Sequence, residues 1–540
     1  MWGAVAALMV LSSVAHLWAL RRTLPLPEID EPFFVRPAMH MAASGDPNPH
    51  WFGHPGSTVI YPLAGLLHVW DVVAHHGPIF TSNPELTARF QRSPGEFYVI
   101  GRLWTIAMSV GALPLLFLVG RRAFNTRVAL AAAAIYAVLP LPVHLGRVVR
   151  TDSAGVFFGL LAVWLCLRLL DEPRTRWCVL AGLGVGLAVS SRYFMVALVP
   201  VLVAAAVLPQ RRALRPAVRS AGIALASAVG GFALSSPYFF LDWHTALDSI
   251  QAEGALDRDP NHVGLSHLGN LRWYLGTTIP ETLTWPLVAL AAAGVVLVVR
   301  RRRARQLLLV AFCVVFLAGI CASKAHWVRW VIPIVPVLVL FAAAAGDAII
   351  RRVAAVPRVP RTSVVAPVAP VALVALTAVL LLHPVRELLA TNRHDTGTTT
   401  IEGPTRSATH DWIVIHVQPG SRILGDSETL SLDDTRFDVE RLNLRTHTLA
   451  DYQEAGHQYL LVNARDAGLY RRDAARRPRE AAFYQDVACH TRLVAVFPRT
   501  PQLIDHDLEV ARHGWPIYVY QLDKPPRRVS DYLCTQRAGD

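Results

Sequence analysis

The stretch GRLWTIAMSVGALPLLFLVGRR, residues 101–122, decides the fold class of this 540-residue chain. Residues 103–120 carry no charged side chain, and Arg121 and Arg122 follow them directly. About 20 apolar residues in a helix cross the hydrocarbon core of a bilayer, and arginines beside such a segment are typical of its cytoplasmic end. This stretch therefore predicts a membrane-spanning helix that ends in the cytoplasm.

The rest of the chain repeats this pattern. It is 53% hydrophobic and only 17% charged, whereas about a quarter of a soluble domain is charged. The pattern predicts a mainly α-helical, polytopic membrane protein with about eleven transmembrane helices. The predicted spans are 2–20, 100–120, 128–146, 153–170, 177–192, 193–209, 220–236, 284–300, 306–322, 328–350 and 363–383.

The distribution of arginine sets the predicted topology and argues against nucleic-acid binding. The net charge of +13 comes largely from arginines in short clusters between apolar segments. With the N-terminus inside, five cytoplasmic loops are arginine-rich, which agrees with the positive-inside rule, although Arg21 and Arg22 would lie outside. These loops are 121–127, 171–176, 210–219, 300–306 and 351–362.

This topology places a first outer loop (21–99) and a polar C-terminal region (384–540) on the far side of the membrane. We expect residues 57–77 of the loop to form a helix at the interface, since Pro62, His68 and Asp71 interrupt its apolar run. Residues 1–383 then form the membrane domain, and 384–540 form an extracytoplasmic α/β domain. Its predicted strands are SRILGDS (421–427), QYLLVNA (458–464), RLVAVF (492–497) and IYVYQL (517–522).

Six cysteines are present. Cys166, Cys178, Cys313 and Cys321 lie in or beside apolar segments, where cysteine behaves as a small hydrophobe. Cys489 and Cys534 lie in the C-terminal region, and the sequence leaves open whether they form a disulfide there.

The acidic pair Asp30-Glu31 follows the first predicted span by about ten residues. Two interpretations stay open: a solvated loop pair, or a carboxylate that acts near the membrane surface. The apolar residues after the pair keep it close to the bilayer. A carboxylate there is suited to act as general base toward a hydroxyl, or to bind a divalent cation.

A rigid loop rich in glycine and proline, GDPNPHWFGHPGSTVIYP (45–62), contributes His50 and His54. Each is a candidate metal ligand, phosphate contact or ordinary surface residue. Pro55 argues against a helix that would bring the two imidazoles together.

Basic residues also occur at the predicted outer ends of spans, against the positive-inside trend. Such charges are costly unless they are paired or used, and clustered cations there suit a lipid-linked phosphate. Binding of lipid headgroups by these side chains is the alternative. The basic residues concerned are Arg147, Arg150, Arg192, Lys324, His326 and Arg329, and Asp152 lies beside Arg147 and Arg150 in the sequence as a possible ion-pair partner.

Taken in order, IDEPFF (29–34), GDPNPHWFGHPG (45–56), RTDSAGVFFGLLA (150–162), SSRYF (190–194), SSPYFFLDW (235–243) and RWVIPIVPVLVL (329–340) resemble the GT-C superfamily of membrane glycosyltransferases. The nearest branch is that of protein O-mannosyltransferases and lipid A aminoarabinose transferases. The resemblance implies the GT-C fold and an inverting transfer of sugar from a polyprenyl-phosphate-linked donor.

The resemblance also implies roles for individual residues. Asp30 would be the catalytic carboxylate with Glu31 as its neighbour. The donor phosphate and sugar would be bound by Arg150, Asp152, Arg192, Lys324, His326, Arg329 and His54. The aminoarabinose transferases carry a Glu-Lys pair where this chain has Gly53-His54, so a divalent metal stays open, with Glu31, His50 and His54 as candidate ligands.

The expected reaction takes place on the outer face of a bacterial inner membrane, with a lipid, glycan or protein as acceptor. The alternative is a transporter or flippase of polyprenyl-linked sugars, which would need an internal repeat and charges at mid-membrane. A membrane-anchored sensor is a third interpretation. The sequence leaves the sugar, the acceptor and the oligomeric state open.

Overall fold

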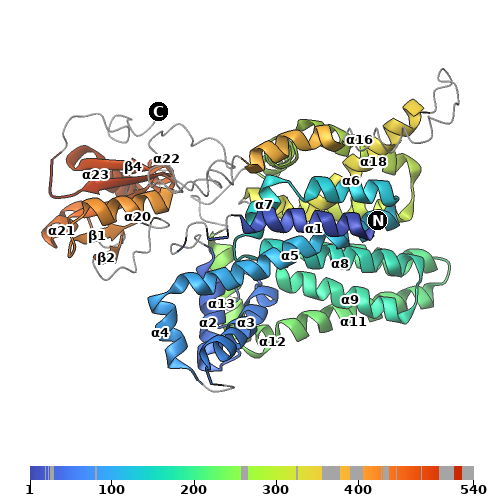
Figure 1. Cartoon of the computed structure of the whole chain (residues 1–540), viewed down its shortest axis with the longest axis horizontal. Coiled ribbons are helices and arrows are strands. Elements are labelled where there is room, and N and C mark those ends of the chain that lie inside the picture. The colour runs from blue at the N-terminus through green and yellow to red at the C-terminus, as the bar shows by residue number, and fades with distance from the viewer. Residues whose placement is uncertain are drawn as a thin grey trace. The chain divides into compact units, whose positions relative to one another are not determined.

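The computed structural model describes the chain except for residues 19, 22–23, 25–29, 79–81, 257–265, 324–325, 355–376, 390–404, 427–428, 430–436, 445–446, 473, 476, 498–515 and 526–540. It divides into two compact units (Figure 1). The helical unit comprises Met1–Arg21 and Asp30–Asn392, and the sheet unit comprises Arg22–Ile29 and Arg393–Asp540.

The helical unit consists of apolar helices joined mostly by short connections. Its elements are α1 (Trp2–Leu17), α2 (Pro32–Ser44), α3 (Ser57–His75), α4 (Pro84–Arg92), α5 (Pro94–Ala123), α6 (Thr126–Tyr136), α7 (Pro140–Gly146), α8 (Thr151–Asp171), α9 (Thr175–Ser191), η1 (Tyr193–Ala197), α10 (Leu198–Val207), η2 (Leu208–Gln210), α11 (Leu214–Ser235), α12 (Pro237–Leu241), α13 (Trp243–Leu256), α14 (His267–Trp273), η3 (Tyr274–Thr278), α15 (Ile279–Leu283), α16 (Trp285–Arg301), α17 (Ala304–Ala322), η4 (Val328–Ile334), α18 (Val335–Ala354) and a helix at 377–389.

Seven helices in the described ranges are long and apolar enough to cross a membrane, and two bent pairs raise this number to nine. The bends lie between α6 and α7 (66°) and between α15 and α16 (115°). Two shorter apolar helices, α1 and α9, coincide with predicted spans. The predicted multi-pass helical fold is thus confirmed. The predicted span 363–383 lies largely outside the described residues.

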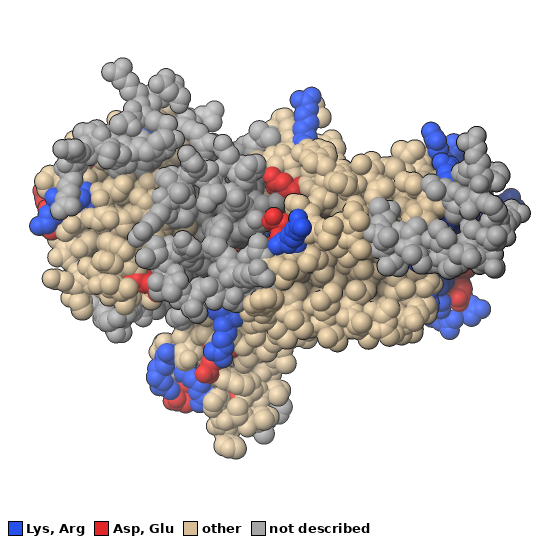
Figure 2. Space-filling model, turned by 45° about the horizontal axis from the view of Figure 1, so that its top comes forward, with Lys and Arg blue, Asp and Glu red and all other residues tan. Residues whose placement is uncertain are grey.

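One of the seven helices is α3, which we expected to lie at the membrane interface. It passes the same test of length and composition as the other spans, so the interfacial placement stays a prediction. Around the unit, large apolar side chains such as Val10, Val229 and Val314 are exposed, as expected of a surface that faces lipid. Figure 2 shows broad uncharged surface on this unit, with charged residues gathered near its ends.

The sheet unit is a five-stranded mixed sheet with helices. Its elements are α20 (Thr405–His416), β1 (Arg422–Gly425), β2 (Asp438–Arg441), α21 (Leu449–Glu454), β3 (Tyr459–Asn463), α22 (Ala464–Arg472), α23 (Pro478–His490), β4 (Arg492–Phe497) and β5 (Ile517–Gln521). The strand order is β2-β1-β3-β5-β4. β1 is parallel to β2 and β3, while β5 is antiparallel to β3 and β4.

Both faces of this sheet are covered, as the alternation along β3 requires. Leu460 and Val462 pack into one core with Tyr484 of α23, while Leu461 packs into a second core with Ile413 of α20. The four predicted strands are confirmed as β1, β3, β4 and β5; β2 was not predicted.

The cysteines divide as their surroundings suggested. The four in or beside the spans are free and buried. Cys489 is disulfide-bonded, and Cys534 lies outside the described residues.

Candidate active site

Four predicted site residues meet at the ends of helices in the helical unit. Asp30 lies in the turn before α2, where Pro32 occupies the first helical position. Arg150 is the N-cap of α8, Arg192 is the C-cap of α9, and Arg329 lies at the start of η4. These residues come from four separate stretches of the chain, so only the tertiary fold brings them together.

Asp30 is held by two arginines. Its Oδ2 lies 2.8 Å from Nη2 of Arg150 and 3.4 Å from Nη2 of Arg329. The side chain is 24% exposed, so a ligand has access to the carboxylate. The guanidinium of Arg329 also stacks over the ring of Trp327, 4.8 Å from its centroid, which helps to fix its position.

Asp152 links the remaining arginine to the same cluster. Its Oδ2 lies 3.5 Å from Nε of Arg150, and its Oδ1 accepts a short hydrogen bond from Nη1 of Arg192. Three arginines therefore surround two aspartates, which leaves one excess positive charge. Such an arrangement can bind an anion with oxygen acceptors, and phosphate is the anion that guanidinium groups bind in bidentate fashion.

The charges around Asp30 determine its protonation. Burial by itself raises the pKa of the Asp30 carboxyl, but Arg150 and Arg329 more than offset this effect and lower the pKa to about 2. Asp30 is therefore ionised at neutral pH. A carboxylate with so low a pKa is also a weak base as long as both arginines hold it.

Glu31 does not share the surroundings of Asp30, although we expected the two to act as neighbours. It is completely buried and receives two hydrogen bonds from Arg102 of α5, at 2.8 Å from Nε and 2.6 Å from Nη2. The backbone N–H of Val149 donates a third bond to it at 3.0 Å. The structure thus places Glu31 in a buried ion pair that joins the start of α2 to α5.

His54 lies among aromatic rings, close enough to Asp30 for their charges to interact. Its imidazole is 5.5 Å from the ring of Trp51 and 6.4 Å from the ring of Phe34. Burial lowers its pKa to about 4; the charge of Asp30 opposes this shift, and the three arginines of the cluster add to it. His54 is therefore neutral at pH 7, and it can exchange hydrogen bonds with a phosphate but not attract it by charge.

Two further basic residues that the sequence singled out, His326 and Arg147, make other contacts. His326 packs its ring against Trp273 of α14, with 4.2 Å between the centroids. Arg147 donates to the backbone oxygen of Ala15 in α1, which makes it a link between helices. Lys324 lies outside the described residues.

The three candidate metal ligands are not brought together either. Glu31 is held by Arg102, while Nε2 of His50 lies 2.8 Å from Oδ2 of Asp46. Across the described ranges no group of three or more His, Cys, Asp or Glu side chains is arranged to hold a metal ion. The sequence left the need for a divalent metal open, and it stays open.

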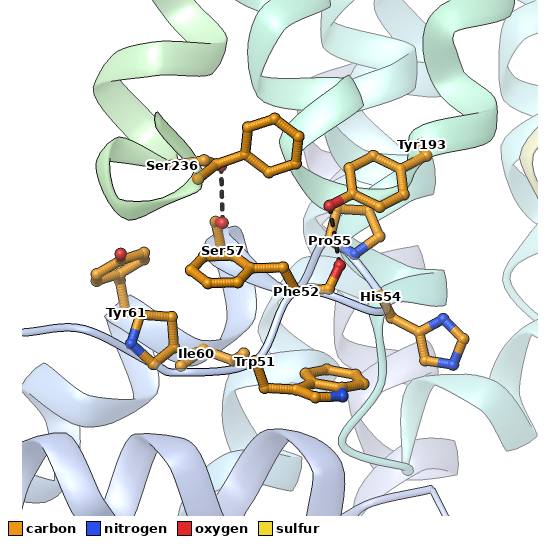
Figure 3. Close-up of a pocket in the computed structure, with 12 residues that line it drawn as sticks. Trp51, Phe52, His54, Pro55, Ser57, Ile60, Tyr61, Tyr193 and Ser236 are labelled. Atoms are coloured by element: carbon orange, nitrogen blue, oxygen red, sulfur yellow. Dashed lines mark hydrogen bonds between the residues drawn. The ribbon is translucent and has the colours of Figure 1, made fainter. Parts of the chain in front are cut away.

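An open pocket of about 290 Å³ lies beside His54. It is lined mainly by aromatic and proline side chains from the loop before α3, with Tyr193 and Phe239 opposite. Figure 3 shows Tyr193 bonded to the backbone oxygen of Phe52 (3.0 Å) and Ser236 bonded to Ser57 (2.7 Å). These bonds fix the loop that carries His54 against α11 and η1.

Sequence reasoning missed two residues near the site. Arg102 interrupts an apolar span, and a charge in that position is costly unless paired, so it was detectable. Glu253 of α13 lies with its Oε1 4.0 Å from Nε2 of His54. No local pattern distinguishes it from the other acidic residues between α11 and α14.

Comparisons with known proteins bear on the fold and on the family. The family model for dolichyl-phosphate-mannose-protein mannosyltransferases matches residues 96–239, which include Arg102, Arg150, Asp152 and Arg192. No curated protein matches the chain.

Solved structures match over nearly the whole chain. ArnT from Cupriavidus metallidurans bound to undecaprenyl phosphate is 13% identical, with a TM-score of 0.52 over 96% of this chain and 97% of that one. The apo form of ArnT is 14% identical, with a TM-score of 0.51 over 99% of each chain. The archaeal oligosaccharyltransferase AglB from Archaeoglobus fulgidus, in complex with an inhibitory peptide and a dolichol-phosphate, is 12% identical over 91% of this chain and 72% of that one, with a TM-score of 0.48.

At these identities the structural matches show the fold, and with the family-model match they confirm the resemblance to the superfamily: this chain is a mainly helical, multi-pass membrane protein with the GT-C fold.

Proposed function

We propose that the chain is an inverting glycosyltransferase that moves a sugar from a polyprenyl-phosphate-linked donor to a hydroxyl group of an acceptor. The observation that carries this proposal is that Asp30 pairs with both Arg150 and Arg329. One carboxylate and three guanidinium groups supply what the reaction needs: a base for the hydroxyl and cations for the departing phosphate.

In the proposed step the acceptor oxygen attacks the anomeric carbon of the sugar. The bond between that carbon and the phosphate oxygen breaks, and polyprenyl phosphate leaves with the bonding electron pair. The proton of the hydroxyl passes to Asp30. Arg150, Arg192 and Arg329 stabilise the negative charge that develops on the phosphate.

Binding of the donor would also increase the basicity of Asp30, which the two arginines lower. As long as Arg150 and Arg329 face only Asp30, they hold its pKa near 2. A bound phosphate would compete for both arginines and add negative charge beside the carboxylate. Both effects raise the pKa of Asp30 toward its usual range, so the base gains strength when the donor is in place.

The arginine-rich loops support an orientation with the site on the outer face of a bacterial inner membrane. In this proposal residues 1–383 carry out the transfer, and residues 384–540 form an extracytoplasmic domain. The donor is a polyprenyl-phosphate sugar, and ArnT, whose fold this chain shares, was solved with undecaprenyl phosphate bound.

The test compares cells that lack this protein with cells that regain it as wild type or as D30N. Mass spectrometry of the cell envelope should detect a glycan that depends on the wild-type protein. D30N should reduce its amount by about 10²–10⁴-fold, the usual contribution of a general base. Normal product with correctly inserted D30N would refute the assignment of Asp30. Repeating the transfer in isolated membranes with and without EDTA tests the metal.

A further inference from the structure

Glu253 contacts the loop that carries His54. It lies on α13, which is fixed to the loop before α3 at two points. Asn48 donates to Oδ2 of Asp242 at 2.8 Å, and the N–H of Phe52 donates to Oγ of Ser249 at 3.3 Å. These bonds hold α13, and with it Glu253, against the loop that carries His54.

The loop makes room for this carboxylate. A Cβ atom added to Gly53 would lie 3.0 Å from Oε1 and 3.1 Å from Cγ of Glu253. A Cβ at position 53 requires the carboxylate to shift by a few tenths of an ångström, and a larger side chain would need the space that Glu253 occupies. Trp51 borders the same space, since its Cζ2 would lie 3.3 Å from that Cβ.

Glu253 differs from the other three carboxylates near the site. Arginine holds each of Asp30, Glu31 and Asp152, whereas no Lys or Arg among the described residues lies within 4.0 Å of Glu253. Burial, and then the charge of Asp30, raises its pKa above the usual value. An ion pair thus does not account for its position, and its side chain is 35% exposed and open to a ligand.

The side chains around Glu253 suit a neutral ligand with several hydroxyl groups. Asp30, His54 and Glu253 together present hydrogen-bond acceptors, and Glu253 repels a phosphate. The indole of Trp51, stacked on Phe33 at 5.6 Å, adds an aromatic surface beside them. Aromatic walls with a few placed polar groups are typical of sites for small amphipathic ligands, such as a sugar ring.

We propose that Glu253 binds the acceptor by accepting a hydrogen bond from a hydroxyl next to the reacting one, so that the acceptor is a sugar. This inference rests on the proposed function. Asp30 then acts on one hydroxyl of the acceptor ring, and Glu253 holds another and sets which hydroxyl reacts.

The test uses the full-length protein with Glu253 changed to Ala or Gln, and with D248N as control. Asp248 is an exposed carboxylate on the same helix. In cells that lack the native protein, E253A should lower the envelope product at least tenfold. E253Q should keep it within threefold of wild type, because the amide oxygen still accepts a hydrogen bond. D248N should match wild type.

Two further readouts separate this role from a general loss of structure. Purified E253A should bind undecaprenyl phosphate with a Kd within threefold of wild type. G53V, whose larger side chain needs the space of the carboxylate without removing the carboxylate, should lower the product at least threefold, and G53V replaces E253A as the test if E253A does not accumulate. Tandem mass spectrometry should find the new linkage on a sugar hydroxyl.

Several results would overturn the inference. These are normal product from E253A, loss of undecaprenyl phosphate binding by E253A, an equal loss in E253Q and E253A, or a linkage to serine, threonine or a lipid without sugar. Failure of the proposed function is distinct: the wild type would then neither bind undecaprenyl phosphate nor change the envelope glycans.

Discussion

Asp30 lies 2.8 Å from Arg150 through a single carboxylate oxygen, and the same oxygen lies 3.4 Å from Arg329. Two of the three clustered arginines are therefore engaged by the residue that we propose as the base. A phosphate that enters the cluster has to compete with this carboxylate. The competition separates the two roles of Asp30, since it promotes transfer but opposes donor binding.

The first prediction follows from this competition. D30N should bind undecaprenyl phosphate about tenfold more tightly than wild type, which corresponds to about 1.4 kcal/mol, while it loses transfer. The reason is that the amide no longer holds Arg150 and Arg329 by charge. Binding is measured with the purified full-length protein in lipid nanodiscs.

The control for this prediction is D46N. Asp46 lies in the loop between α2 and α3, is 43% exposed and pairs with His50 instead of an arginine. It should leave the Kd unchanged. Weaker binding by D30N than by wild type would contradict the competition between the carboxylate and the phosphate.

The sequence predicted most of this fold because apolar length and alternation are local signals. The stretch 101–122 lies in α5, and the alternating runs became β1, β3, β4 and β5. β2 was missed because its four residues, DVER, contain only one apolar side chain and therefore show no alternation.

The site was only partly predictable, for a physical reason. Asp30 and Glu31 are adjacent in the sequence, yet one meets the arginine cluster and the other Arg102, because successive side chains point in different directions at the start of a helix. Glu253 comes near His54 only through the packing of α13 on the loop before α3. Short-range patterns carry no information about such a contact.

The second prediction concerns the buried pair of Glu31 and Arg102. Either E31Q or R102M leaves a buried polar or charged group without its partner, and each should destabilise the protein by about 3–5 kcal/mol. The double variant should have a higher melting temperature than the less stable of the two single variants, because neither charge remains. The measurement is the melting temperature in detergent.

The exposed pair of Glu85 and Arg92 supplies the matched control, with side chains 59% and 63% exposed. E85Q should lower the free energy of unfolding by no more than about 1 kcal/mol, as is usual for the loss of a surface ion pair. If E31Q melts like E85Q, the buried pair does not stabilise the start of α2.

The third prediction is a pH dependence that comes from His54. Its pKa is about 4 in the folded protein, against 6.5 as the ordinary value. Between these values the unfolded chain binds a proton that the folded protein does not, so stability falls as the pH drops from about 6.5 to 4. H54Q should show a smaller fall in melting temperature between pH 7 and pH 5 than wild type. Equal falls in the two proteins would mean that His54 does not have a lowered pKa.

The fourth prediction concerns the close packing of α9 on α11. A Cβ atom on Gly182 would overlap the backbone oxygen of Ala224, and one on Gly186 would lie 2.6 Å from the backbone nitrogen of Phe232. Backbone atoms cannot move aside as a flexible side chain can, so the helices have to separate. Small residues allow such close approach between membrane helices. G182A and G186A should each lower the free energy of unfolding by about 1–3 kcal/mol, the usual range for overpacking.

Two glycines on α11 provide the comparison for this effect. A Cβ atom on Gly222 or Gly230 would meet nothing within 4 Å. G222A and G230A should therefore melt at or above the wild-type temperature, since alanine favours a helix by about 1 kcal/mol over glycine in water. Because α9 ends at Arg192, separation of the two helices should also displace this arginine. G186A should then weaken undecaprenyl phosphate binding and G230A should not; equal binding by both variants would show that the arginine cluster does not depend on this helix contact.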